Sequence, residues 1–168
     1  MYDLDVSWDE YHHSIEQLAE NIFQSQWEFD RIVCLARGGM RVGDILSRIF
    51  NKPLAILATS SYGGEDRQTR SKLAIASQIT MTDNRMGKRV LLVDDLVDSG
   101  VTLQQTTIWL RDLYPEIEDL KTAVIWYKAC SQYIPEYYVT HLPHNPWIHQ
   151  PFEKYDRYKL STAARNCP

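Results

Sequence analysis

The sequence predicts an α/β fold with a doubly wound, mainly parallel sheet. Short apolar runs rich in β-branched residues alternate with amphipathic helical stretches, which is typical of a sheet covered by helices on both faces. The chain has 168 residues, of which 44% are hydrophobic and 11% aromatic, enough for one buried core. No repeat, low-complexity tract or linker interrupts it. We therefore expect a single domain over residues 1–168.

The N-terminal part predicts a helix followed by two strands. Residues 7–10 (SWDE) read as a capping box. The apolar residues that follow at helical spacing are Tyr11, Ile15, Leu18, Ala19, Ile22 and Phe23. His12 and His13 fall between them without a partner at ligand spacing, so we expect both on the surface. Buried strands are expected at 31–35 and 53–59, with a helix at 42–50 between them.

The rest of the chain continues this alternation. A long polar loop with two glycines, Ser60–Ser71, follows the second strand, and a loop of that length in a compact domain points to a functional lid. Further strands are expected at 73–79, 90–93, 122–127 and 137–141, with a polar turn at 82–88.

The most informative segment joins strand 90–93 to the next helix. Two adjacent carboxylates, Asp94 and Asp95, end the strand. The residues that supply hydroxyls and a permissive backbone at the helix start are Ser99, Gly100 and Thr102. A helix start carries unsatisfied N–H groups and partial positive charge, so it suits a phosphate. The carboxylates suit vicinal hydroxyls or a metal ion. A plain βα unit, with carboxylates that only cap the helix, is the simpler alternative.

Ligands of such sheets bind beyond the carboxyl ends of the strands. This rule brings together three loops that are distant in sequence, 36–39, 60–71 and 94–102. In the first of them, glycines let backbone amides approach an anion, and Arg37 offers a cation with several donors.

Residues 89–103 resemble the phosphoribosyl-pyrophosphate (PRPP) signature of type I phosphoribosyltransferases, with an apolar strand, two acidic residues and a D-S-G-x-T loop in that order. The Ala36-Arg37-Gly38-Gly39 turn looks like the pyrophosphate loop of the purine branch, which carries a non-proline cis peptide that we expect at Ala36–Arg37. Ser60-Ser61-Tyr62 resembles the start of that branch's mobile lid. The likeness extends from Ser7 to about Phe152.

The resemblance implies a role for each matching residue. Those implied to bind PRPP are Asp94, Asp95, Asp98, Ser99, Gly100, Val101 and Thr102. Those implied to bind pyrophosphate are Ala36, Arg37, Gly38 and Gly39, and the lid residues are Ser60, Ser61, Tyr62, Arg67 and Arg70. Asp95 is the implied metal contact, with Mg²⁺ as the cofactor. Asp98 is the implied catalytic residue, which takes up the ring proton of the purine.

A C-terminal hood over residues 137–158 is implied to bind the base. Lys128, at the end of a strand, would donate to an exocyclic carbonyl oxygen, and Trp147 and Ile148 would pack on the purine. A solvated lysine and a tryptophan that only packs the C-terminal extension are the alternatives. His149 stands where the bacterial xanthine-guanine branch has glutamate, so base preference is left open. Arg41-Val42 replaces that branch's valine-proline pair, which affects the helix entry near pyrophosphate.

The implied activity is Mg²⁺-dependent transfer of the phosphoribosyl group from PRPP to a 6-oxopurine (guanine, xanthine or hypoxanthine) in purine salvage. A homo-oligomer, dimer or tetramer, is also implied. Two alternatives remain. A PRPP-sensing regulator would need a DNA-binding module or a basic RNA-binding face, and neither is visible. A pyrimidine enzyme is disfavoured by Lys128 and the Trp147 segment.

Composition narrows the partners. The formal net charge of −4 gives no basic field for nucleic acid. The three cysteines, Cys34, Cys130 and Cys167, lack any CxxC or Cys/His metal spacing, which suits a reducing compartment. The N-terminus is acidic where a signal peptide would be basic, and no apolar run approaches the length of a membrane span. We therefore expect a cytoplasmic protein without a membrane span.

Overall fold

The computed structural model describes residues 3–62 and 72–158. The chain forms two compact units, one of residues 14–145 and one of residues 1–13 with 146–168. Each unit is described by itself. No helix in the described ranges is both long and apolar enough to cross a membrane.

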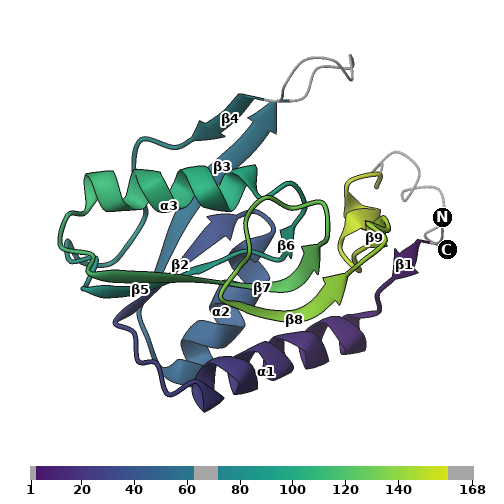
Figure 1. Ribbon diagram of the computed structural model, residues 1–168, viewed down its shortest axis with the longest axis horizontal. Coiled ribbons are helices and arrows are strands. Elements are labelled where there is room, and N and C mark those ends of the chain that lie inside the picture. Colours follow the sequence, from purple (N-terminus) through teal and green to yellow (C-terminus); the bar gives the residue numbers. More distant parts are fainter. Residues whose placement is uncertain (1–2, 63–71, 159–168) are drawn as a thin grey trace, which may run out of the picture. The chain divides into compact units, whose positions relative to one another are not determined.

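The larger unit contains a seven-stranded sheet in the order β4-β3-β2-β5-β7-β6, with β8 also paired to β7 (Figure 1). The strands are β2 (Arg31–Ala36), β3 (Leu54–Tyr62), β4 (Lys72–Ile75), β5 (Arg89–Val93), β6 (Leu96–Val97), β7 (Asp119–Lys128) and β8 (Tyr137–Leu142). These strands pair in parallel, apart from β3 and β4, which are antiparallel. The predicted doubly wound, mainly parallel sheet is confirmed.

Two helices cover opposite faces of this sheet (Figure 1). Helix α2 (Gly39–Phe50) lies in the connection from β2 to β3, which moves toward the β4 side of the sheet. Helix α3 (Val101–Leu113) lies in the connection from β5 to β7, which moves toward the opposite side. Right-handed crossovers in opposite directions place helices on opposite faces. The core cluster that contains Leu103 and Leu110 of α3 takes alternate residues of the strands, such as Val90 and Leu92 of β5. The strands are thus apolar on both faces, as expected of a buried parallel sheet.

The winding direction reverses between β2 and β5, which are neighbours in register from Arg31↔Val90 to Cys34↔Val93. A reversal of this kind opens a crevice at the carboxyl ends of the two strands, where ligands of open α/β sheets bind. The segments that leave these ends are residues 36–39 and 94–102, which the sequence had marked as a site.

Three differences from the predicted elements concern β3, the strand after the predicted lid, and Phe23. Strand β3 continues to Tyr62 because Ser60, Ser61 and Tyr62 pair with Ala74, Leu73 and Lys72 of β4. The expected loop at 60–71 therefore begins with strand, and the strand expected at 73–79 ends at Ile75. The third difference is Phe23, which is 75% exposed at the edge of the helical stripe, whereas Tyr11, Ile15, Leu18 and Ile22 are fully buried.

The first helix, α1 (Trp8–Gln24), begins in the smaller unit and continues into the larger one. Its predicted capping box is confirmed. The Ser7 hydroxyl accepts from the Glu10 backbone N–H at 3.2 Å, and the Glu10 carboxylate accepts from the Ser7 N–H at 2.8 Å. His12 and His13 are exposed, as expected.

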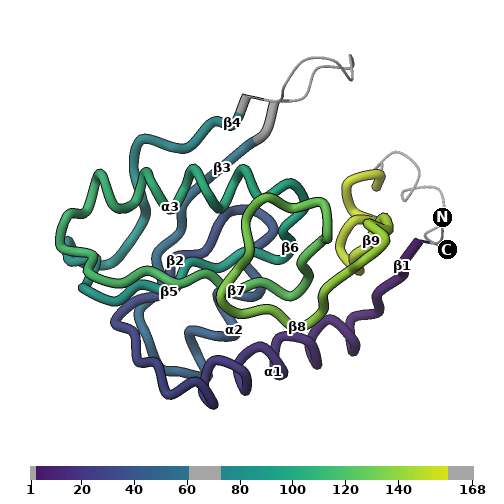
Figure 2. Tube along the Cα trace, in the orientation of Figure 1, coloured from purple at the N-terminus to yellow at the C-terminus, as the bar shows by residue number. Residues whose placement is uncertain are grey.

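In the smaller unit, β1 (Leu4–Asp5) pairs in parallel with β9 (Ile148–His149), and a 3₁₀ turn, η1 (Glu153–Tyr155), follows. Figure 2 shows these N- and C-terminal segments side by side. The rings of Tyr11 and Phe152 meet edge to face, with centroids 5.7 Å apart. The hood was predicted over 137–158, whereas β8 belongs to the large sheet and the C-terminal segment clusters with residues 1–13. The sequence gives no local signal for a pairing between segments so far apart.

Candidate active site

The acidic pair at the end of β5 is held by its backbone. The Asp94 N–H donates to the Ala123 carbonyl at 3.2 Å, and the Asp95 carbonyl accepts from the Ile125 and Trp126 N–H groups at 3.0 and 3.1 Å. The Asp95 N–H donates to Asp94 Oδ1 at 3.0 Å. Strand β7 therefore fixes the backbone from which both carboxylates extend.

The two carboxylates repel each other. Burial, and next the charge of Asp95, raise the pKa of Asp94 well above its ordinary value. Asp95 itself is only 9% exposed. Hydroxyl donors or a divalent cation would relieve this repulsion, so the pair fits both ribose hydroxyls and Mg²⁺.

Asp94 and Asp95 are adjacent carboxylates at the end of β5. Within residues 3–62 and 72–158, no group of three or more His, Cys, Asp or Glu side chains is arranged to hold a metal ion. Mg²⁺ usually keeps several waters and binds through one or two carboxylates together with phosphates of the substrate. The pair therefore fits a metal ion that arrives with its substrate.

The Ala36–Gly39 loop touches this pair, as the sequence predicted. A Cβ on Gly38 would lie 2.7 Å from Asp95 Cγ, and one on Gly39 would lie 2.5 Å from the Val93 carbonyl oxygen. Only glycine fits at either position. The peptide bond between Ala36 and Arg37 is cis, as expected. Helix α2 begins at Gly39 without a side-chain cap, and its first N–H groups lie beside the acidic pair.

The loop after β6 forms the third part of the site. It encloses a cavity of about 380 Å³ lined by Asp94, Asp95, Leu96, Val97, Asp98, Ser99, Gly100, Thr102 and Leu103. Gly100 has φ of 84°, and a Cβ there would meet the Tyr133 backbone nitrogen at 2.7 Å. Helix α3 begins at Val101, also without a side-chain hydrogen bond at its N-cap. Amides of a helix start that line a cavity suit an anion.

Lys128 lies at the carboxyl end of β7 and is only 5% exposed. Its ammonium nitrogen is 3.4 Å from Asp98 Oδ2, and the Asp98 side chain is 61% exposed. The sequence predicted a strand-end lysine for the base, but it did not predict that Lys128 pairs with Asp98.

Cys130 is a site residue that the sequence did not reveal. Its sulfur is 3.5 Å from Asp98 Oδ1 and 3.6 Å from the Asp98 carbonyl oxygen, with the thiol as donor. Burial, and then the hydrogen bond to Asp98 and the charge of that carboxylate, raise the pKa of Cys130. Its spacing carried no signal because the sequence has no second cysteine or histidine at ligand spacing.

The predicted lid residues divide into two groups. Ser60, Ser61 and Tyr62 belong to β3, so the start of the predicted lid is strand. Arg67 and Arg70 lie outside the described residues, and their assignment to pyrophosphate stays a prediction.

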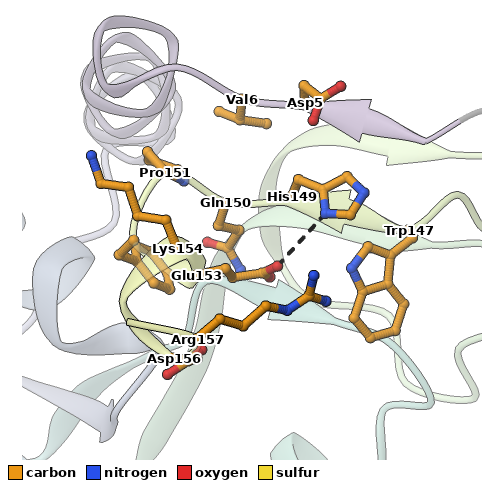
Figure 3. Close-up of a pocket in the computed structure, with 11 residues that line it drawn as sticks. Asp5, Val6, Trp147, His149, Gln150, Pro151, Glu153, Lys154, Asp156 and Arg157 are labelled. Carbon is orange, nitrogen blue, oxygen red and sulfur yellow. Dashed lines mark ion pairs between the residues drawn. The ribbon is translucent and has the colours of Figure 1, made fainter. Parts of the chain in front are cut away.

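Trp147 lines a cavity of about 690 Å³ in the smaller unit (Figure 3). Its side chain is 57% exposed, whereas Ile148 on β9 is 3% exposed. His149 Nε2 is 3.1 Å from Asp3 Oδ2, and its Nδ1 is 4.0 Å from Glu153 Oε2. Figure 3 shows Glu153 and Arg157 extending toward the space beside Trp147 and His149. The assignment of Trp147 and Ile148 to the base stays a prediction.

Comparison with known proteins agrees with this geometry. Residues 7–157 match the family described as phosphoribosyl transferase domain. The xanthine-guanine phosphoribosyltransferase of Idiomarina loihiensis is 29% identical over 154 residues, which cover 91% of this chain and 88% of that protein.

Two solved structures share the fold. A purine phosphoribosyltransferase from Pyrococcus horikoshii superposes with a TM-score of 0.73 at 28% identity, covering 90% of this chain and 94% of that one. The xanthine-guanine-hypoxanthine phosphoribosyltransferase of Helicobacter pylori gives a TM-score of 0.76 at 23% identity, covering 93% and 98%. The chain therefore belongs to the phosphoribosyl transferase domain family, as an enzyme with the type I phosphoribosyltransferase fold that resembles the purine branch.

Proposed function

We propose that this enzyme transfers the phosphoribosyl group of PRPP to a 6-oxopurine, with Mg²⁺, and releases pyrophosphate. The observation that carries the proposal is the meeting of two loops, 36–39 and 94–102, at the carboxyl ends of β2 and β5. The acidic pair touches the Gly38–Gly39 loop, and it lines one cavity with the start of α3. The similar proteins named xanthine-guanine and purine phosphoribosyltransferase support the choice of base.

The reaction breaks the anomeric bond, which leaves positive charge on the ribose and negative charge on the departing pyrophosphate. The amides and hydroxyls at the start of α3 would hold the 5′-phosphate, and Asp94 and Asp95 would accept hydrogen bonds from the ribose hydroxyls. Their charge also suits the developing cationic ribose. Mg²⁺, when bound with pyrophosphate near Asp95, would neutralise part of the leaving group's charge.

The Ala36–Gly39 loop would hold the leaving group. Its two glycines leave no side chain between the loop and the acidic pair, so backbone amides can approach a pyrophosphate there. Arg37 is exposed at the same turn, and a guanidinium binds phosphate oxygens through two parallel hydrogen bonds.

Asp98 and Lys128 would act on the purine. Asp98, whose side chain is 61% exposed, can take up the ring proton as the new bond forms. An ammonium group has three donors, so Lys128 can pair with Asp98 and also donate to a 6-oxo group. Adenine places an amino donor at that position, where the base should present an acceptor to Lys128, and this mismatch costs roughly 1–3 kcal/mol.

A PRPP-dependent assay across guanine, xanthine, hypoxanthine, adenine and uracil tests the proposal. We expect nucleotide from one or more 6-oxopurines, very little from adenine or uracil, and no product when EDTA replaces Mg²⁺. Lys128→Ala should lower activity on 6-oxopurines far more than on adenine, whereas Lys121→Ala, in the same strand but paired to the Trp27 ring, should not change base selection. If adenine or uracil is used as well as guanine, the 6-oxopurine assignment is wrong.

A role in purine salvage follows from the proposed reaction. Assembly as a homo-oligomer and a cytoplasmic location stay predictions. Light scattering coupled to gel filtration would test the first of them, with a monomer at micromolar concentration as the contrary result.

A further inference from the structure

Cys130 lies against the residue that we assign to proton transfer. Its thiol is 3.5 Å from Asp98 Oδ1, while Lys128 Nζ is 3.4 Å from Asp98 Oδ2. We propose that Cys130 is a positioning residue, which orients the Asp98 carboxylate toward the reacting base. This inference rests on the proposed function and adds a residue to it.

The contacts constrain the carboxylate in two ways. Each of its oxygens faces a different donor, a thiol on one side and an ammonium on the other. The same sulfur is also 3.6 Å from the carbonyl oxygen of Asp98. A donor placed between the backbone and side-chain oxygens of one residue limits rotation of that side chain about its first bond.

Asp98 needs such a constraint because its side chain is 61% exposed and sits on a loop between β6 and α3. An exposed carboxylate samples several rotamers, and each step that fixes it costs conformational entropy. A catalytic group must be held close to its productive geometry before the substrate binds. The ammonium of Lys128 alone is a weak guide, since a point charge imposes little direction.

Cys130 is itself well placed to give direction. Its backbone N–H donates to Asn145 Oδ1 at 3.0 Å, and Asn145 has φ of 50°. The next turn is joined to the phosphate loop, because the Gln132 N–H donates to the Ser99 carbonyl at 3.0 Å. Segment 129–133 therefore supports the 98–100 loop through the backbone.

A thiol in this place acts as a donor and not as a nucleophile. Burial and the adjacent Asp98 carboxylate raise the pKa of Cys130, so the proton stays on sulfur at neutral pH. Serine would keep a donor at this position on a shorter bond, and alanine would remove it.

Kinetics of four variants, Cys130→Ala, Cys130→Ser, Asp98→Asn and the Asp98→Asn/Cys130→Ala double variant, test the inference. We expect Cys130→Ala to lower kcat by about three- to tenfold, because one weak hydrogen bond to Asp98 is lost. The KM for PRPP should not change. Cys130→Ser should recover most of the rate. In an Asp98→Asn background, Cys130→Ala should have no further effect, because its action passes through the carboxylate. An equal loss in both backgrounds, or no loss at all, would overturn the inference.

A second measurement does not need catalysis. The rate of iodoacetamide alkylation of Cys130, followed by mass spectrometry of its peptide at pH 8, reports the contact directly. Asp98→Asn should raise that rate by about two- to fivefold, since removing a neighbouring negative charge favours the thiolate. Asp112→Asn, an exposed carboxylate on α3, is the matched control and should leave the rate unchanged.

The two measurements separate the possible failures. If the wild-type enzyme makes no nucleotide but Asp98→Asn still accelerates alkylation of Cys130, the proposed function is wrong. The Cys130–Asp98 contact is then still supported. Active wild-type enzyme with equal alkylation rates in the parent and Asp98→Asn would contradict the positioning role alone.

Discussion

Arg31 and Lys128 are two buried cations at opposite ends of the parallel strands, and their carboxylate partners are bound in different ways. Arg31 lies at the amino ends of the strands, called the amino edge below, and Lys128 lies at the carboxyl ends, called the carboxyl edge. Arg31 begins β2 and is 3% exposed, and Lys128 ends β7 and is 5% exposed. The Arg31 guanidinium donates to both oxygens of Asp83 at 2.8 Å and to the Arg85 carbonyl at 3.1 Å. The Lys128 ammonium is 3.4 Å from one oxygen of Asp98.

The carboxylate partners are similarly exposed, 50% for Asp83 and 61% for Asp98, so solvent access does not explain the difference. Directional hydrogen bonds from a fixed guanidinium hold the Asp83 loop in place. At the carboxyl edge, the 3.4 Å contact between Lys128 and Asp98 is made by a point charge, which imposes little direction. We therefore expect the Arg31 contacts at the amino edge to serve stability, whereas the proposed function places ligands at the carboxyl edge.

The largest expected effect is at the carboxyl edge. Asp94→Asn combined with Asp95→Asn should lower kcat/KM for PRPP by about a thousandfold or more, because both acceptors for the ribose hydroxyls are weakened together. Thermal unfolding should show a protein at least as stable as the parent, since a repulsive pair is removed. Retained turnover would remove the ribose-binding assignment.

Lys128→Met should lower kcat/KM for 6-oxopurines by about a hundredfold with little change in melting temperature. Methionine keeps the apolar stem of the lysine buried, and the exposed Asp98 carboxylate can be hydrated once its partner is lost. Steady-state kinetics beside a thermal melt would check both parts. A large fall in melting temperature would mean that this pair is structural too.

Arg31→Met is the matched change at the amino edge and should give the opposite pattern. We expect the free energy of unfolding to fall by about 1–3 kcal/mol. This is the usual contribution of charge-assisted hydrogen bonds, reduced because the Asp83 partner is exposed to solvent. Urea unfolding would measure it. Where the variant is folded, its kcat/KM should match the parent, and a specific loss of activity would contradict the division between the two edges.

The pH dependence of stability gives the smallest effect and the finest test. The pKa of Asp94 is raised in the folded protein, so ionisation of this carboxyl destabilises the fold at pH values above that pKa. The destabilisation decreases as the pH falls through the folded pKa, and it is absent once the pH is below the ordinary pKa of an aspartate. Asp94→Asn should therefore raise the melting temperature at pH 7.5 and raise it less at each step toward pH 4.5. A constant difference across this range would mean that burial and the Asp95 charge do not raise the pKa of Asp94 in the folded protein.

The sequence predicted the central strands well because both of their faces are buried. Strands β2 and β5 read as apolar runs, and their predicted bounds agree with the structure within one residue. Strand β6 was not predicted, since its two residues form a strand only by pairing with Trp126 and Tyr127 of β7. The extension of β3 to Tyr62 likewise depends on its partner β4.

The site was predictable where its residues directly follow a predicted strand and carry a recognisable chemical group. Asp94, Asp95 and the Gly38–Gly39 turn could be brought together because each follows a strand on either side of the reversal in winding. The Cys130–Asp98 contact could not, since it depends on how the turn after β7 folds onto the phosphate loop. The pairing of β1 with β9 joins residues near the two ends of the chain, and short strands of this kind carry no periodic signal.

The glycines of the Ala36–Gly39 turn have a consequence for protein engineering. Gly38 faces the Asp95 carboxylate and Gly39 faces the backbone at Val93 and Asp94, so the two loops pack together because the turn contributes no side chain at either position. A graft of the acidic loop onto another parallel sheet would meet a Cβ at those positions unless the glycine turn were moved with it. The smallest transplantable module is therefore the pair of adjacent strands β2 and β5, with their Cys34↔Val93 register and both of their following loops.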